Sequence, residues 1–474
     1  MKPEGSLKKL WSNSINMITE IFQGKELSSI AHKTKFIQRS TSLLQGKDFV
    51  ELMTTVSIDS KVVSLEGLCS ELRNRNPEVD LRPQSLMERI NQSESTDFLK
   101  TVFHKALKKS LTNIVERIPP DLLASFNNVW LEDCSECVLN EKLQEEFKGS
   151  SGVTSKSCVK LDLIYEIKQK NIFSVDLTDR RSPDQKLAQR HLKIVQAGDL
   201  WIRDLGFFDA SVFKAIAALG AFFLSRLPAC VYVYLNKEDK DPMDLAKYIN
   251  RNFPNHSAID IEVYVTTAKL PVRLVAYRAP KELAEERRRV ANKEAKKKGQ
   301  QRSKASMGRL DFTFFITNVS KEVWKVEVIG TIYTVRWQIE LIFKTWKSQL
   351  QINYLKGINS NRIKCLLYGK LIAIVVINII YKFCDWYAQK IGKEISLHKV
   401  VNWLKRDLRL ALIIFQKFSN NIFNSLVREI PLSLSKQKRK RKTTQDALEQ
   451  GIPYCDLYAN MNAQSFENET VKVA

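Results

Sequence analysis

The clearest hydrophobic pattern in the chain lies in residues 331–350, TIYTVRWQIELIFKTWKSQL, where apolar residues recur at helical spacing and neither Gly nor Pro interrupts them. We predict an α-helix here, with Ile339, Ile342, Trp346 and Leu350 on the side that packs against a core. At about 100° per residue, four of the polar residues fall on an arc of about 60° on the opposite side. The helix therefore combines an apolar face with a narrow polar stripe.

Shorter apolar runs upstream predict the strands of a sheet. The predicted strands are 128–133, 157–167, 171–177, 200–202 and 222–224. The second and third form a hairpin across a short turn. One helix is predicted to begin with Ser182 as N-cap and Pro183 in its first position. Another is predicted to be capped by Asp209 and ended by Gly220. This order of strands and helices indicates an α/β layer with a mixed sheet.

Residues 231–305 interrupt this layer. Segments 259–265 and 272–278 alternate between apolar and polar residues as antiparallel strands do. The stretch 281–304 is very basic and poor in apolar residues, so it forms either a solvated helix or a mobile loop. Its role is either that of a soluble connector or that of an arm facing DNA. The sheet pattern resumes at 310–317.

The outer parts of the chain show helical patterns. The helices predicted there are Ser64–Arg73, Arg82–Asn91, 363–387 and 396–418. The first two could form a unit similar to a helix-turn-helix, so residues 1–120 are either a DNA-gripping module or a helical scaffold. Residues 436–442, KQKRKRK, open a polar tail with little capacity to form a core, which we expect to be disordered and which could hold DNA nonspecifically.

Composition narrows the class of protein. A chain of 474 residues is expected to form two to four domains, and 44% hydrophobic residues indicate a globular protein. The excess of 75 Lys and Arg over 52 Asp and Glu, +23 in total, favours a polyanion as partner, although a basic soluble protein is the alternative. The most apolar run, 371–380, is too short to cross a bilayer and predicts a buried helix. We expect no membrane partner and a cytoplasmic location.

Cysteine use agrees with an intracellular protein. The eight cysteines are scattered along the chain, which predicts reduced thiols rather than disulfides. Cys134 and Cys137 form a CxxC pair, but no second pair and no nearby His complete the four ligands of a structural zinc site. We therefore expect no zinc.

The polar stripe of the predicted helix is the strongest chemical signal. It carries Tyr333, Arg336, Glu340 and Lys347, which suit a metal ion on the carboxylate and a phosphate on the other three. The alternative is an ordinary amphipathic helix with an Arg336–Glu340 ion pair. The spacing resembles the Y-x2-R-x3-E-x6-K signature of DDE transposases of the IS-four insertion-sequence group, and the neighbouring Trp337 is also typical of that group.

Two further acids can join Glu340. Asp133 and Asp204 each follow an apolar strand, and Glu132 should point to the opposite face of the sheet. Two Mg²⁺ ions that promote phosphoryl transfer need oxygen ligands from several converging acids. Three carboxylates within about 5 Å repel by roughly 3 kcal/mol per pair at an effective dielectric near 20, so such a site should depend on metal.

The resemblance widens around these acids. NVWLEDCSECVL is similar to the first motif of the family and GDLWIRDLGFFD to the second, so that it covers about residues 128–350. It implies that Asp133, Asp204 and Glu340 are the catalytic, metal-binding carboxylates. In many relatives Gly-Thr follows the first acid, whereas this chain has Cys134 and Ser135.

The resemblance also implies a ribonuclease H-like α/β fold, in which a mixed sheet with flanking helices is interrupted by a β-rich insertion between helical N- and C-terminal regions. The expected regions are 1–120 helical and DNA-end-binding, 121–230 first part of the catalytic core, 231–305 insertion with basic arm, 306–355 second part of the core, 356–430 helical and oligomerising, and 431–474 basic tail.

The function implied is that of a DNA transposase, with two Mg²⁺ ions for which Mn²⁺ can substitute. It would cut double-stranded DNA at the ends of a mobile element and join these ends to target DNA. Some relatives form a hairpin intermediate between the two steps. The protein would act as a homodimer at the nucleoid. Tyr333, Arg336 and Lys347 would hold terminal phosphates, and Arg226, in FFLSRL, would touch DNA. Trp337 would pack beside a displaced base or in the core. Two rivals remain, a related nuclease without strand transfer and a non-catalytic DNA-binding protein.

Overall fold

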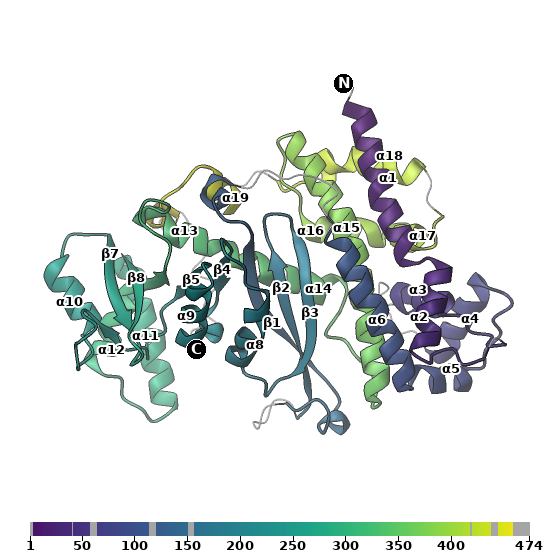
Figure 1. The fold of residues 1–474 in the computed structure, drawn as a ribbon, viewed down its shortest axis with the longest axis horizontal. Helices are drawn as coiled ribbons and strands as arrows, with labels where there is room; N and C mark the ends of the chain where they lie inside the picture. The colour runs from purple at the N-terminus through teal and green to yellow at the C-terminus, as the bar shows by residue number, and fades with distance from the viewer. Residues whose placement is uncertain are drawn as a thin grey trace. The chain divides into compact units, whose positions relative to one another are not determined.

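The structure is a computed structural model that describes residues 3–39, 41–56, 64–112, 120–149, 156–417, 420–437 and 444–457 (Figure 1). The chain forms two compact units. The first comprises Met1–Arg117, Cys134–Ser182 and Ile339–Lys438, and the second comprises Ile118–Asp133, Pro183–Gln338 and Arg439–Ala474. The backbone passes between the units directly after Asp133 and directly before Ile339.

The strands of the described residues form a mixed sheet in the order β3-β2-β1-β4-β5-β9-β8-β7-β6. Their bounds are β1 Val129–Val138, β2 Cys158–Glu166, β3 Asn171–Asp179, β4 Leu200–Arg203, β5 Phe222–Arg226, β6 Val233–Tyr234, β7 Ala258–Val265, β8 Leu270–Arg278 and β9 Phe312–Thr317. Strands β1, β4 and β5 are parallel, whereas β2 with β3 and β5 with β9 are antiparallel. The predicted α/β class with a mixed sheet is confirmed, and β6–β8 lie within the predicted insertion 231–305.

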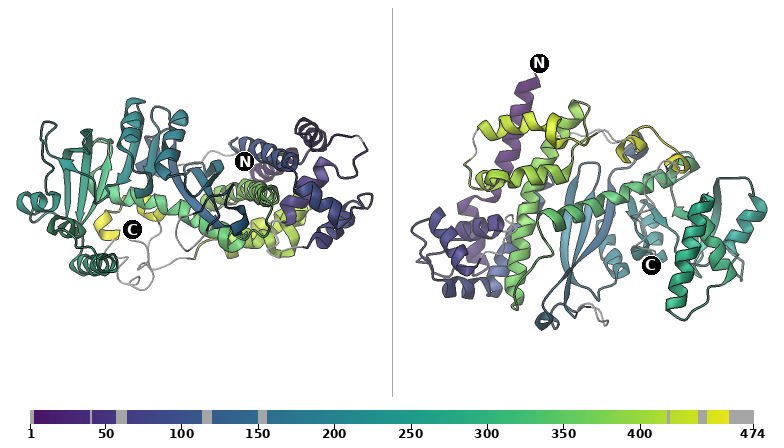
Figure 2. Two further views of the ribbon diagram at one scale, coloured as in Figure 1. Left: turned by 90° about the horizontal axis from the view of Figure 1, so that it is seen from below. Right: turned by 180° about the vertical axis from the view of Figure 1, so that it is seen from behind.

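The first unit is built around one long helix. Its helices are α1 Pro3–Ile21, α2 Gly24–Lys33, α3 Gly46–Val56, α4 Leu65–Arg75, α5 Pro83–Ile90, α6 Ser93–Ser110, α15 Ser360–Lys390, α16 Leu397–Lys405, α17 Arg409–Ile414 and α18 Asn420–Glu429, with most of α14 (Trp337–Gln349). Helix α15 contacts α1, α3 and α6 (Figure 1) and the strand β3 (Figure 2). The predicted N-terminal helix pair, α4 and α5, is present.

Helix α15 is long and apolar enough to cross a membrane by length and composition, with a mean hydropathy of 2.1 over its most apolar window, of which 89% is buried. Its buried Lys382 is also bonded inside the unit. The Lys382 Nζ donates to the Ser110 carbonyl at 2.9 Å and to the Asn171 Oδ1 at 2.6 Å. Because buried polar groups are costly without such partners, these contacts fit a core helix, as the sequence predicts.

The second unit holds the parallel strands β4 and β5 and the inserted strands. Its helices are α7 Asp121–Ala124, α8 Asp184–His191, α9 Ala210–Ala218, α10 Leu245–Asn252, α11 Lys281–Lys297, α12 Lys304–Gly308, α13 Ile329–Tyr333 and α19 Thr444–Glu449. The Asp209 side chain caps α9 by accepting from the Ser211 N–H at 2.8 Å, as predicted. Gly220 follows α9 with φ +73°, a conformation that suits glycine and ends the helix.

Four local predictions are wrong. The predicted helix 396–418 is broken, because a 3₁₀ turn in which Asp407 has a φ of +53° separates α16 from α17. Ser182 does not cap α8, whose N-cap is Pro183, because the Ser182 N–H is bonded to the Asp179 Oδ1 at 3.0 Å in the preceding turn. Strand β1 does not end at Asp133 but continues to Val138. Residues 331–350 are not one helix, because a 3₁₀ turn over Thr334–Arg336 separates α13 from α14.

The 3₁₀ turn has a local cause. The Thr334 hydroxyl donates to the Thr331 carbonyl at 2.6 Å, an interaction that competes with regular helical bonding. Thr334 also lies in a run rich in β-branched residues, which lowers helix propensity. The apolar face predicted for α14 is nonetheless buried at Ile339, Ile342 and Trp346.

The basic stretch after β8 forms helix α11, so the helical alternative predicted for residues 281–304 is confirmed over most of its length. Its arginines are occupied within the second unit. Arg287 donates to the Phe312 carbonyl at 3.2 Å, Arg288 pairs with Asp311, and Arg289 pairs with Glu286 at 2.7 Å. Fewer cations are therefore left for DNA than the sequence indicates, and a DNA-facing role for this helix stays a prediction.

The C-terminal tail is not devoid of core. Residues 444–457 include α19 and a second helical turn, and Ala447, Leu448, Tyr454 and Leu457 are buried. Helix α19 contacts α7 and α13. The expectation of a disordered tail is therefore wrong for this segment, while 438–443 and 458–474 lie outside the described residues.

Candidate active site

The parallel strands of the second unit bring two acids side by side. The register pairs Leu131 with Ile202 and Glu132 with Arg203, so Asp133 and Asp204 occupy the next position on neighbouring strands. Neighbouring strands lie about 4.8 Å apart and successive side chains alternate between faces, so both carboxylates emerge on the same face. Asp133 and Asp204 are therefore neighbours in the sheet although they lie far apart in the sequence.

Asp133 and Asp204 begin a row of side chains that runs across the sheet at matching strand positions, and strand β5 extends this row. Arg203 pairs with Ser225, which places Arg226 level with Asp204, and Arg226 in turn pairs with Phe315 on β9. Arg226 is exposed at the end of its strand. The row across the sheet therefore contains two acids, one arginine and one aromatic ring.

Two residues from α13 and the 3₁₀ turn reach this row. The Arg336 Nη1 lies 3.7 Å from the Asp133 Oδ2, and its Nε lies 3.7 Å from the Asp204 Oδ1. The Tyr333 hydroxyl donates to the Asp204 Oδ1 at 3.3 Å. The structure therefore brings together four sequence-predicted site residues within one unit, namely Asp133, Asp204, Tyr333 and Arg336.

Charge balance explains why the two acids can lie so close. Like charges on adjacent strands repel, and the Arg336 guanidinium, whose side chain is only 13% exposed, offsets this repulsion by facing both. Burial, together with the negative charge of Asp204, raises the pKa of Tyr333 above its usual range, although Arg336 and Arg226 oppose the shift. The Tyr333 hydroxyl therefore stays protonated and remains a hydrogen-bond donor.

The remaining predicted residues lie on α14. Trp337 is its first residue and 47% exposed, so the core alternative for this side chain is wrong. Glu340 lies in the first turn of α14 and Lys347 in the last. Glu340 and Lys347 belong to the first unit, and their roles stay predictions. In sequence, Glu340 follows Arg336 by four residues.

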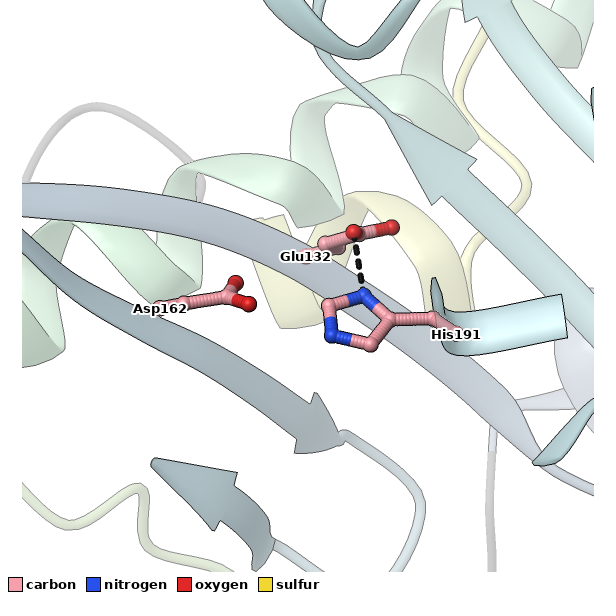
Figure 3. A group of neighbouring side chains, drawn as sticks. All are labelled: Glu132, Asp162 and His191. Carbon is pink, nitrogen blue, oxygen red and sulfur yellow. Dashed lines mark hydrogen bonds and ion pairs between the residues drawn. The ribbon is translucent and has the colours of Figure 1, made fainter. Parts of the chain in front are cut away.

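The opposite face of the sheet holds a buried ionic cluster. Glu132 and Arg203, the residues just before the two acids, pair at 2.8 Å with both side chains fully buried. The His191 Nδ1, at the end of α8, lies 2.6 Å from the Glu132 Oε1 (Figure 3). Because Glu132 joins β4 and α8 to β1, the cluster ties together the elements that carry Asp133 and Asp204.

Sequence reasoning placed Glu132 on this face but missed its partners. The signal was available, because Glu132-Asp133 and Arg203-Asp204 are both charged doublets at the ends of apolar strands. Glu132 and His191 are also residue types that bind metals, and Figure 3 draws them with Asp162, which lies on β2 of the first unit. The Arg203 guanidinium beside Glu132 opposes a cation there.

The donor set of the row fits magnesium. Asp133 and Asp204 offer carboxylate oxygens on adjacent strands, and Mg²⁺ is usually bound through one or two carboxylates. The two acids already attract the cationic Arg336 side chain, so the same carboxylates can also attract a metal cation. At the CxxC pair, burial raises the pKa of Cys137 to about 12, which disfavours the thiolate that zinc requires.

The chain is similar to proteins that are all described as transposases. Residues 132–376 match the family model described as "Transposase DDE domain". The transposase of insertion sequence element IS231B from Bacillus thuringiensis subsp. berliner is 26% identical over 449 residues, covering 90% of this chain and 92% of the relative. The transposase of IS1151 from Clostridium perfringens is 27% identical over 451 residues, covering 90% and 93%.

Among solved structures, the chain is similar to piggyBac transposase in a synaptic complex with hairpin DNA, determined by cryo-EM. The TM-score is 0.43 at 9% identity, and the match covers 91% of this chain and 87% of that chain.

Proposed function

The chain belongs to the transposase DDE-domain family, and we propose that it binds the ends of an insertion sequence, cleaves them by metal-dependent hydrolysis and joins the freed 3′-hydroxyl ends to target DNA. One observation carries the proposal. Asp133 and Asp204 lie at matching positions of two parallel strands, and Arg336 faces both of them at 3.7 Å. This arrangement joins oxygen ligands for a cation to a group that binds phosphate.

Asp133, Asp204 and Glu340 would hold two Mg²⁺ ions, for which Mn²⁺ can substitute. When bound, such ions activate the attacking oxygen and stabilise the leaving one. The chain's own acids then act as fixed ligands, because Glu132 and Arg203 hold the two strands in register from the buried face. With cations bound to the acids, the Arg336 guanidinium can turn its planar fork to a phosphate.

The DNA backbone would lie over the remaining polar groups. Arg336 and the protonated Tyr333 hydroxyl donate to phosphate oxygens, with Lys347 further along α14 and Arg226 at the edge of the row. The exposed Trp337 ring offers a stacking surface for a displaced base, since base–aromatic stacking contributes about 1–3 kcal/mol per base. A related nuclease would share the three acids but would not need these contacts of Tyr333, Arg336 and Lys347 with the DNA backbone.

Two ends of one element must be processed together, so the active complex is proposed to be a homodimer on double-stranded DNA. The net charge of +23 favours such a polyanion. The proposed location is the cytoplasm, at the nucleoid. The domain roles predicted from the sequence, DNA-end binding by residues 1–120 and oligomerisation by 356–430, belong to the same proposal.

The test uses the full chain, a labelled duplex carrying an end of the element that encodes it, and a supercoiled plasmid. With Mg²⁺ we expect nicks at the element end and products joined to the plasmid. Nicks without joined products would favour a nuclease, and retardation of the duplex without cleavage would favour a DNA-binding protein.

Glu340→Gln tests the third acid. It keeps the shape of the side chain but weakens cation binding, so we expect end binding to remain and nicking to be lost. Glu322→Gln, an exposed carboxylate of the second unit, serves as the matched control and should nick at the rate of the unaltered protein. Unchanged nicking by Glu340→Gln would remove this residue from the mechanism.

A further inference from the structure

The C-terminal segment 444–457 is packed directly behind the candidate active site, within the second unit. Helix α19 contacts α13, the short helix that ends at Tyr333. The Thr331 hydroxyl, inside α13, donates to the Ile452 carbonyl at 2.7 Å. The segment therefore contacts the element that delivers Tyr333 and Arg336.

The central contact is a ring over a glycine. A Cβ placed on Gly330 would lie 2.3–2.6 Å from three ring carbons of Tyr454, closer than real Cβ atoms approach. Tyr454 is only 7% exposed, and its ring centroid lies 4.7 Å from that of Tyr277 and 5.7 Å from that of Phe315. The absence of a side chain at Gly330 is thus what allows the ring to lie against α13.

The same aromatic cluster reaches the row of acids. Phe315 also packs on Tyr333, with ring centroids 5.0 Å apart, and the Tyr333 hydroxyl donates to Asp204. Phe315 therefore separates Tyr454 from Tyr333 and contacts both. Tyr277 adds a polar contact, because its hydroxyl accepts from the Gly330 N–H at 3.0 Å.

The position of α13 determines where the next turn begins. A 3₁₀ turn over Thr334–Arg336 comes directly after α13, and such turns have poorer hydrogen-bond geometry than α-helix. A shift of α13 would move Tyr333 and Arg336 relative to Asp204 and Asp133. In enzymes a misplacement of about 1 Å can reduce the rate on the order of 100-fold.

We propose that Tyr454 is a positioning residue: docked on Gly330 and Phe315, it holds α13 so that Tyr333 and Arg336 face Asp204 and Asp133. The C-terminal segment is thereby part of the active site's support rather than an appended tail. This inference rests on the proposed function for its effect on cleavage, whereas its effect on α13 is independent of that function.

The first experiment measures nicking of a labelled element end by full-length variants. Tyr454→Ala removes the ring and should reduce the nicking rate on the order of 100-fold with little change in end binding. Tyr454→Phe keeps the ring and should restore the rate to within about threefold. Tyr234→Ala, which removes another buried tyrosine of the same unit from β6, controls for loss of stability and should keep nicking.

The second experiment asks whether the ring acts at Gly330. Gly330→Ala forces the ring away and should reduce nicking as Tyr454→Ala does. The double variant should be no slower than either single variant, because both changes remove the same contact. Additive losses in the double variant would overturn the coupling.

The third experiment does not depend on DNA. Hydrogen–deuterium exchange of the peptide spanning 326–336 should be faster in Tyr454→Ala than in the unaltered protein and in Tyr454→Phe. If the unaltered protein fails to cleave, the proposed function is wrong. The exchange rate of peptide 326–336 still shows whether Tyr454 holds α13 in place. Unchanged exchange in Tyr454→Ala, or equal loss of nicking in Tyr234→Ala, would overturn the inference.

Discussion

A buried lysine should make the stability of the first unit depend on pH in an unusual direction. Lys370, on α15, donates to the Leu350 and Gln351 carbonyls at 3.0 and 3.1 Å, where the chain leaves α14. Lys405 adds a bond to the Gln349 carbonyl at 2.6 Å. Cations at a helix C-terminus are favourable, yet burial dominates and lowers the pKa of Lys370 to about 8.

The magnitude follows from this pKa. The usual value for lysine is 10.5 and the folded value is about 8, a difference of about 2.5 units. At about 1.4 kcal/mol per unit, the protonated side chain costs the folded state about 3 kcal/mol. Below pH 8 both states are protonated and this cost is fully present. As pH rises from about 8 to about 10.5 only the unfolded state keeps the proton, so the free energy of unfolding should increase.

The assay is urea unfolding between pH 7 and pH 10 for the unaltered protein and Lys370→Met. Methionine cannot titrate, so the difference in unfolding free energy between the two proteins should change by up to about 3 kcal/mol across this range. Lys390→Met, an exposed lysine at the end of α15, is the matched control and should follow the unaltered protein. Parallel pH curves for Lys370→Met and the unaltered protein would refute the reasoning.

Other perturbations have defined outcomes. Arg203→Met leaves Glu132 buried without its guanidinium and should lower the free energy of unfolding by about 3–5 kcal/mol in urea titrations, with partial recovery when Glu132→Gln is added. Asp209→Ala removes the cap of α9 and should cost about 1 kcal/mol in thermal unfolding, whereas Asp209→Asn should cost less. Arg336→Gln should slow nicking about 100-fold or more at saturating DNA, a result contradicted if only the concentration for half-maximal rate changes.

Much of the sheet and of its neighbouring helices could be predicted because their signals are local. The hairpin of β2 and β3, the cap at Asp209 and the stop at Gly220 all depend on residues within a few positions of one another. The extension of β1 to Val138 was missed because the polar residues after Asp133 do not resemble a strand. Local patterns therefore predict elements well but their ends less well.

The features that were missed depend on partners distant in sequence. The charged doublet at Glu132 indicates a charged partner, but the identity of Arg203 and His191 as partners follows only from the register of two strands and the placement of α8. The docking of Tyr454 likewise depends on a glycine in a different element. Of the four residues that meet on the sheet, Tyr333 and Arg336 were predicted from the spacing of a motif, whereas Asp133 and Asp204 were predicted from their positions after apolar strands.

The aromatic docking site behind α13 has a practical consequence for anyone who shortens this protein. A chain ending before residue 444 would uncover the rings of Tyr277 and Phe315, which are now almost fully buried. Contiguous apolar surface exposed in this way promotes aggregation. Purification yield and storage behaviour should therefore suffer along with catalysis, and affinity tags are better attached at the other terminus.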